Sequence, residues 1–270
     1  MNETESNRNL GAIESPADER DWIAEDLLGS TGELPETHYA QLAHLPVYNQ
    51  RTQPSCGGNA GAKLQNILLD LNSALSSRFV YALCKKIDGY PNSQGTTGRA
   101  VMQVLQKYGV CDDSFFPDNV SLPYAEYSDW RLIPQIAYIN AMSRRIGPFA
   151  RVTDLSFRGL KRAIHENTAV FVLKKPWVPA SWSTEENETG HFFDLHSYDL
   201  STIHFANSFG RLWMHSGDGR LTEDDVKTIR EAWTCIQPPT HIENLEKQVS
   251  LLQKVVLLYT QLKQLLGLKK

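Results

Sequence analysis

The sequence predicts an α+β protein of two lobes, an N-terminal helical lobe and a C-terminal antiparallel sheet or barrel lobe, with an appended C-terminal helix. Three observations predict this fold. Apolar residues recur at helical spacing between residues 60 and 105. Short runs rich in β-branched and aromatic residues dominate between residues 169 and 206. After residue 241, apolar residues recur every seven positions.

The first lobe is expected to contain three helices and the second lobe three main strands. The helices are predicted to follow Cys56, to cover Arg78–Ile87 and to cover Thr97–Tyr108, where Gly109 ends the third. The strands are predicted over Ala169–Leu173, His191–Tyr198 and Thr202–Ala206, with one helix over Leu155–His165. An active site is expected in a cleft between the lobes.

The chain divides into three predicted regions. Residues 1–33 are polar and acidic, which is typical of a flexible tail, and the folded domain is expected over residues 34–240. Residues 241–270 are predicted to form an amphipathic, coiled-coil-like helix, because an apolar residue occupies every seventh position at Leu245, Leu252, Tyr259 and Leu266. This helix can pack on its own domain, on a membrane surface or on a second copy. Self-association into a homo-oligomer is the outcome we predict.

Composition excludes several classes of function. The hydrophobic fraction of 41% and charged fraction of 21% are ordinary for a soluble globular protein. A net charge of -4 without a basic stripe makes nucleic acid an unexpected partner, and no apolar run is long enough for a membrane span. Without a CxxC pair or an HExxH motif, no metal or other cofactor is expected. The N-terminus lacks the pattern of a secretory signal, which favours the cytoplasm.

The cysteines offer one candidate nucleophile. Four cysteines are too few for a dense disulfide framework, and Cys84 and Cys111 can either pair or stay reduced. Cys56 is expected in the first turn of a helix, with Ser55 as its N-cap, where the helix dipole stabilises a thiolate. Gln50, six residues upstream, carries an amide that can donate to an oxyanion.

Two residues downstream complete a candidate catalytic set. His191 and Asn207 are expected on neighbouring antiparallel strands, so that Asn207 can orient the imidazole ring. His191 would then act as general base and general acid toward the thiol of Cys56. The combination predicts peptide hydrolysis by a thiolate nucleophile through an acyl-enzyme.

Three segments resemble the papain family of cysteine peptidases, especially its compact bacterial-type members. They are Asn49-Gln50 with Cys56, Gly190-His191 leading into Ser197-Tyr-Asp199, and Asn207-Ser-Phe-Gly210. In that family the His and Asn follow the Cys by about 130–150 residues, and here they follow it by 135 and 151. The resemblance covers roughly residues 34 to 225, and it implies the papain-like fold and peptide or protein substrates.

The resemblance also implies substrate-binding positions. Gly95 and Thr97 match the wall along which backbone groups hold an extended peptide. Phe209 replaces a tryptophan that shields the His–Asn hydrogen bond in the family. Phe192 replaces a small residue after the histidine, and its ring would narrow the pocket for the second residue before the cut.

Two alternatives stay open at this point. In a shifted register Gln53 is the amide donor and Asn59 stands in the nucleophile's place, which predicts an inactive pseudo-enzyme that serves as a peptide-binding or scaffold module. Peptidoglycan amide hydrolysis by a related Cys–His fold is the other alternative. Such enzymes usually use a second histidine or an acid as orienter, so Asn207 argues against it.

Overall fold

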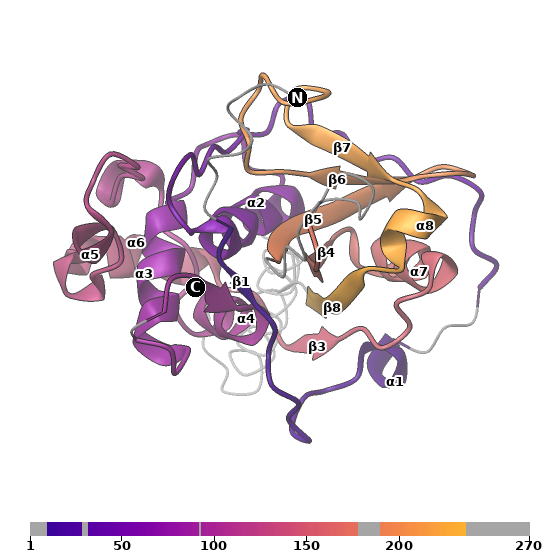
Figure 1. The fold of residues 1–270 in the computed structure, drawn as a ribbon, viewed down its shortest axis with the longest axis horizontal. Coiled ribbons are helices and arrows are strands. Elements are labelled where there is room, and N and C mark those ends of the chain that lie inside the picture. The colour runs from indigo at the N-terminus through magenta and orange to yellow at the C-terminus, as the bar shows by residue number, and fades with distance from the viewer. Residues whose placement is uncertain (1–9, 29–31, 92, 178–189, 236–270) are drawn as a thin grey trace, which may run out of the picture. The chain divides into compact units, whose positions relative to one another are not determined.

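The computed structural model describes residues 10–28, 32–91, 93–177 and 190–235, and in this part of the chain the predicted two-lobe α+β arrangement is confirmed (Figure 1). The helices are α1 Ala24–Leu28, α2 Cys56–Leu69, α3 Ser77–Ile87, α4 Gly98–Lys107, α5 Tyr124–Tyr127, α6 Gln135–Ala141, α7 Phe157–Asn167 and α8 Glu223–Val226. The strands are β1 Ala12–Ile13, β2 Thr96–Thr97, β3 Phe149–Arg151, β4 Val170–Lys174, β5 His191–Tyr198, β6 Ile203–Ala206, β7 Asp218–Leu221 and β8 Ile229–Cys235. The C-terminal helix predicted over residues 241–270 lies outside the described residues.

The predicted helices of the first lobe are confirmed, and local capping explains where two of them begin. The Ser76 hydroxyl accepts a hydrogen bond of 3.0 Å from the Phe79 amide, and the Thr97 hydroxyl accepts one of 3.2 Å from the Ala100 amide. Helix α4 ends where Gly109 adopts a φ of +76°, which a glycine tolerates without strain. Helix α2 differs, because Ser55 occupies its N-cap position but its side chain makes no capping hydrogen bond.

The second lobe is built on a six-stranded antiparallel sheet with strand order β3-β8-β4-β5-β6-β7. Side chains of strand β5 alternate between two cores. Phe192 packs with residues of α2, α3 and α4, whereas Phe193 and Leu195 pack with residues of α7. All eight residues of β5 are consequently buried, and the sheet is covered on both faces.

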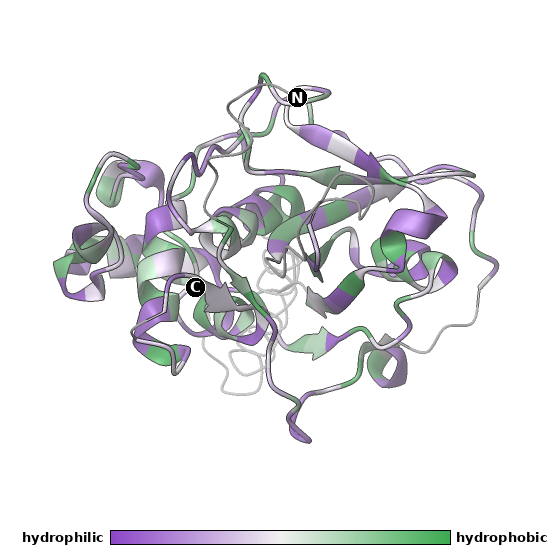
Figure 2. Ribbon diagram, viewed as in Figure 1, coloured by the Kyte–Doolittle hydropathy of each residue, from purple (hydrophilic) through white to green (hydrophobic). Residues whose placement is uncertain are grey.

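Helix α2 is the element that joins the two lobes, and its glycines permit a close approach. A Cβ atom at Gly58 would lie 2.5 Å from the Ser77 carbonyl oxygen, and one at Gly61 would lie 2.8 Å from a methyl group of Val101. The helix therefore packs tightly on α3 and α4. Figure 2 shows hydrophobic residues along α2 and α4, whereas α8 and β7 at the edge of the sheet lobe are more hydrophilic.

Among the described residues, no helix is both long enough and apolar enough to cross a membrane.

The packing of Phe192 generates a stability prediction. Its ring is fully buried and stacks on Phe171 with centroids 4.8 Å apart. Truncation to alanine leaves a cavity between α2 and the sheet, so Phe192→Ala should lower the free energy of unfolding by about 3–5 kcal/mol in denaturant titration. Phe115→Ala is the matched control, because that ring is already 36% exposed, and it should cost less than half as much. Equal losses would contradict the packing described here.

Candidate active site

Cys56 is the first residue of α2, at the boundary between the lobes, and its side chain is 0% exposed. Burial raises the pKa of the Cys56 thiol, and hydrogen bonds from the backbone amides of Phe192 and Gly11 offset part of that effect. The helix N-terminus alone would lower the pKa of the thiol, so the net shift of the pKa is opposite to that expectation. Burial disfavours the thiolate, because the charged form would lack water.

His191 and Asn207 meet as the sequence predicted. His191 begins strand β5, Asn207 follows strand β6, and the His191 Nε2 and Asn207 Oδ1 atoms are 2.7 Å apart. An amide oxygen only accepts hydrogen bonds, so Nε2 carries the proton and Nδ1 is the basic nitrogen of the neutral ring. Asn207 is itself held in place. Its side-chain Oδ1 accepts a hydrogen bond of 2.7 Å from the Ser208 backbone amide. Its backbone amide donates a hydrogen bond of 2.8 Å to the Gly217 carbonyl.

Aromatic rings enclose the imidazole of His191. The Phe209 ring lies with its centroid 4.8 Å from that of His191, where the resemblance implied a shield for the His–Asn pair. The Trp177 ring packs edge-on at 4.5 Å, and it also contacts Phe209 at 5.8 Å. No motif in the sequence pointed to Trp177. The available signal was its place just after strand β4, which pairs with β5 in the sheet.

Gln50 is fully buried and bonded to the segment that carries Asn207. Its backbone amide donates a hydrogen bond of 3.0 Å to the Ser208 carbonyl, and its side-chain oxygen accepts one of 2.5 Å from the Ser208 hydroxyl. The side-chain Nε2 donates 3.1 Å to the Gln53 carbonyl. The structure thus links Gln50, just upstream of Cys56, to the residue that follows Asn207.

Gln53 and Asn59, which the shifted register would place in the site, have their side chains bonded to other parts of the chain. The Gln53 side chain donates to the carbonyls of Val120 and Leu122 at 3.0 and 2.9 Å. Asn59 lies one turn into α2, fully buried, and donates 2.9 Å to the Ser55 carbonyl. These contacts favour the register in which Gln50 and Cys56 belong to the site.

Gly95 and Thr97, the predicted peptide-binding wall, hold an extended segment of the chain itself. Strand β1 pairs in parallel with β2, and the Thr96 amide donates 2.8 Å to the Gly11 carbonyl. On the other side, the Ala12 amide donates 3.4 Å to the carbonyl of Gly190, the residue before His191. The Thr97 hydroxyl is used to cap α4.

Gly11 can occupy this place only as a glycine. A Cβ atom there would lie 2.1 Å from the Pro54 carbonyl oxygen and 2.8 Å from the Gly95 Cα atom. Figure 1 shows β1, in indigo, passing where the helices on the left meet the sheet on the right. We call residues 10–21 the N-terminal segment. The first residues of this segment cover Cys56.

Phe192 and the three remaining cysteines are all buried. Phe192 contributes its amide to the environment of the Cys56 sulfur, while its ring packs in the core beside Gly57. Its role in narrowing a substrate pocket stays a prediction. Cys84, Cys111 and Cys235 are buried and free. Within the described ranges, no group of three or more His, Cys, Asp or Glu side chains is placed to hold a metal ion.

Comparisons with solved structures identify the fold. Xylellain, a cysteine protease from Xylella fastidiosa, is similar with a TM-score of 0.70 and 20% identity, over 86% of this chain and 97% of that one. Procathepsin B S9 from Trypanosoma congolense is similar with a TM-score of 0.63 and 13% identity, over 87% and 88% of the two chains. A Carica candamarcensis cysteine protease in complex with E-64 is similar with a TM-score of 0.57 and 14% identity, over 75% of this chain and 99% of that one.

These similarities confirm that the chain has the fold of the papain-like cysteine peptidases. No protein-family model matches the sequence, and no curated protein resembles it in sequence.

The covering of Cys56 generates a prediction about its reactivity. Gly11→Val cannot fit between Pro54 and Gly95, so in the full-length chain it should displace β1 and expose the sulfur. Desolvation is the larger influence on the thiol, so its pKa should fall, and labelling by a thiol-reactive epoxide should reach its plateau at lower pH. At pH 7 the labelling rate, followed by mass spectrometry, should rise by at least about tenfold.

The matched control is Gly32→Val. A Cβ atom at Gly32 meets nothing within 4 Å, so the same substitution should leave the labelling of Cys56 unchanged. Equal rates in both variants and the parent would show that β1 does not control access to the sulfur.

Proposed function

We propose that this chain is a cysteine peptidase in which Cys56 is the nucleophile, His191 the general base and acid, and Asn207 the residue that orients the histidine. The observation that carries the proposal is the 2.7 Å contact between His191 and Asn207, in a papain-like fold whose central helix begins at Cys56. The substrates would be peptides or proteins.

In the proposed reaction, each step has a candidate residue. With Nε2 bound to Asn207, the Nδ1 nitrogen of His191 is free of a proton in the neutral ring and can take the thiol proton from Cys56. The thiolate then attacks the peptide carbonyl. The N-terminus of α2 favours the negative charge that develops there, and the Gln50 amide is the candidate side-chain donor to the oxyanion.

The second half of the reaction uses the same groups. The imidazolium returns its proton to the leaving amine, and water hydrolyses the acyl-enzyme with His191 again as base. Trp177 and Phe209 pack on the imidazole and keep water from competing for the His–Asn hydrogen bond.

Activity requires that Gly11, Ala12 and Ile13 leave. They pair with Thr96 and Thr97 and contact Gly190, so a substrate backbone cannot occupy the same groups while they are present. In this covered state the Cys56 thiol is buried, and burial raises its pKa. In the uncovered state, water and the helix N-terminus both favour the thiolate.

Mutation of the three proposed catalytic residues tests this function. In the full-length Gly11→Val background, Cys56→Ala should abolish cleavage of a fluorogenic peptide mixture. His191→Ala should lower kcat by about 10³-fold or more, because it removes the general base and acid. Asn207→Ala should lower kcat by a smaller factor, since it leaves the base in place but unoriented.

Exposed residues of the same types provide matched controls. His215→Ala and Asn119→Ala lie on the surface and should leave kcat unchanged. If a thiol-reactive epoxide labels Cys56 but no peptide is cleaved, the pseudo-enzyme alternative replaces this proposal. If Asn207→Ala retains full turnover, its orienting role is wrong.

A further inference from the structure

The residue before Cys56 has its side chain turned away from the start of helix α2. Ser55 is fully buried and occupies the N-cap position, where a serine hydroxyl ordinarily accepts a hydrogen bond from the second or third helical amide. Those amides belong here to Gly57 and Gly58. The Ser55 hydroxyl makes no such bond, so α2 starts without the cap that its sequence offers.

Side chains from α2 and α5 engage this hydroxyl instead. The Asn59 Nδ2 atom donates a hydrogen bond of 3.0 Å to the Ser55 Oγ atom, and the Tyr127 hydroxyl lies 3.2 Å from the same atom. Both Asn59 and Tyr127 are fully buried. The direction of the Ser55 side chain is consequently set by partners that are not helix amides.

The phenol of Tyr127 is fixed by contacts of its own. Its hydroxyl donates a hydrogen bond of 2.7 Å to the Asp118 Oδ1 atom, and the Arg78 side chain on α3 donates one of 3.1 Å to its backbone carbonyl. The Gln53 side chain binds two backbone carbonyls of the loop between Asp118 and Tyr127. The chain just before Cys56 is therefore tied to this loop at both Gln53 and Ser55.

With the cap withheld, the amides at the start of α2 serve the sulfur. Burial is the largest influence on the Cys56 thiol and raises its pKa, whereas hydrogen bonds from backbone amides, including those of Cys56 and Gly57, lower it. Gly57 is one of the two residues whose amide a capping serine would occupy. A capping Ser55 would thus compete with the sulfur for the same donor.

We propose that Tyr127 and Asn59 are positioning residues for the nucleophile. By holding the Ser55 hydroxyl away from the helix start, they keep the first amides of α2 available to the Cys56 thiolate and to the oxyanion that forms beside it. This rests on the proposed peptidase function, in which Cys56 attacks the substrate. Each of the two residues acts through Ser55 and not on the substrate.

The rival interpretation is that these contacts only stabilise the helical lobe. Tyr127 and Asn59 are buried, so loss of their polar groups would lower stability under either interpretation. The two interpretations differ in the part played by the Ser55 hydroxyl. Damage from a misplaced cap requires that hydroxyl, whereas damage from lost packing does not.

A double-mutant cycle in the full-length Gly11→Val background separates the two interpretations. Tyr127→Phe keeps the ring and frees the Ser55 hydroxyl to cap the helix. Labelling of Cys56 by a thiol-reactive epoxide at pH 7 should then slow by about tenfold, the size of one hydrogen bond to a charged group. At alkaline pH, where the thiol is ionised in both proteins, labelling of the variant should no longer lag behind that of its parent.

The second arm of the cycle removes the hydroxyl that would form the cap. In the Ser55→Ala background, Tyr127→Phe should change the labelling rate at pH 7 by less than about twofold. Asn59→Ala removes the other partner of the same hydroxyl, and its cycle should give the same pattern. It is the variant to use if the melting temperature shows that Tyr127→Phe is unfolded under the assay conditions.

Turnover provides an independent measurement. With a fluorogenic peptide at pH 7, Tyr127→Phe should lower kcat by about tenfold and leave KM within about twofold, because the change affects the sulfur and not the groups that bind the peptide. Tyr138→Phe is the matched control. It removes a hydroxyl from a half-buried tyrosine of α6 whose ring packs on Phe79 in the same lobe, and it should leave labelling and turnover unchanged.

Labelling requires no turnover, so failure of this proposal and failure of the proposed function are distinguishable. If no peptide is cleaved, the peptidase function fails, and the labelling cycle still decides the role of Tyr127 and Asn59. If Tyr127→Phe slows labelling equally with and without the Ser55 hydroxyl, the positioning role is overturned while the function stands. The same holds if Tyr127→Phe and Asn59→Ala both label at the parent rate.

Discussion

Close packing of helix α2 between the helical lobe and strand β5 is the constraint on which the rest of the structure depends. Glycines at positions 58 and 61 let the helix approach α3 and α4 to distances that any side chain would prevent. Phe192 fills the space on the sheet side. With the helix fixed in this way, its first residue, Cys56, is held next to the start of β5, where His191 lies.

The same boundary explains why the site is closed in this structure. An extended peptide that lies between Thr96 and Gly190 satisfies backbone groups on both lobes, and Gly11, Ala12 and Ile13 supply that peptide. Absence of a side chain at Gly11 is what lets the backbone reach the sulfur. Burial raises the pKa of the thiol, and the hydrogen bond from the Gly11 backbone offsets part of that rise.

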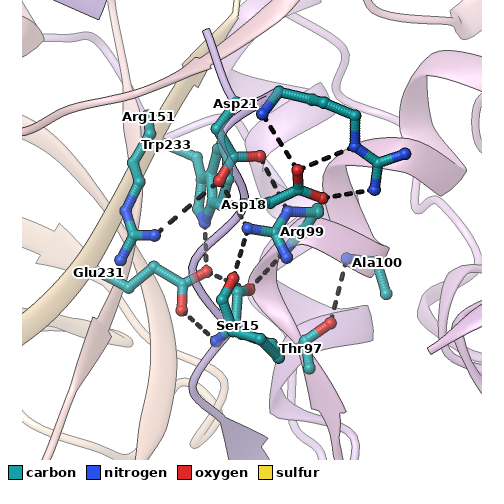
Figure 3. A network of polar contacts seen from close by, with 11 residues as sticks. Ser15, Asp18, Asp21, Thr97, Arg99, Ala100, Arg151, Glu231 and Trp233 are labelled. Carbon is teal, nitrogen blue, oxygen red and sulfur yellow. Dashed lines mark hydrogen bonds and ion pairs between the residues drawn. The ribbon is translucent and has the colours of Figure 1, made fainter. Parts of the chain in front are cut away.

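Polar contacts beyond the sulfur fasten the N-terminal segment to both lobes (Figure 3). Ser15 completes the hydrogen bonding of Glu231, and Asp21 engages Arg99, so one segment bridges β8 and α4 through oppositely charged partners.

Local sequence patterns were sufficient to predict much of the secondary structure and the candidate site residues. Helical spacing after Cys56, the stop at Gly109 and the β-branched runs before and after His191 are properties of short windows, and the structure has helices and strands in those places. The spacing of Gln50, Cys56, His191 and Asn207 was sufficient to propose a site, because those residues follow a recognisable order along the chain.

Contacts between distant residues decided the rest. Nothing local to Ser55 shows that its side chain leaves the helix uncapped, and nothing in residues 1–33 shows that Gly11 fits between Pro54 and Gly95. Trp177 gained its place beside His191 through the pairing of β4 with β5. Glu231 meets Ser15 across 216 positions of sequence. Such pairings depend on how the lobes pack, and a sequence window, which records only neighbours along the chain, cannot contain them.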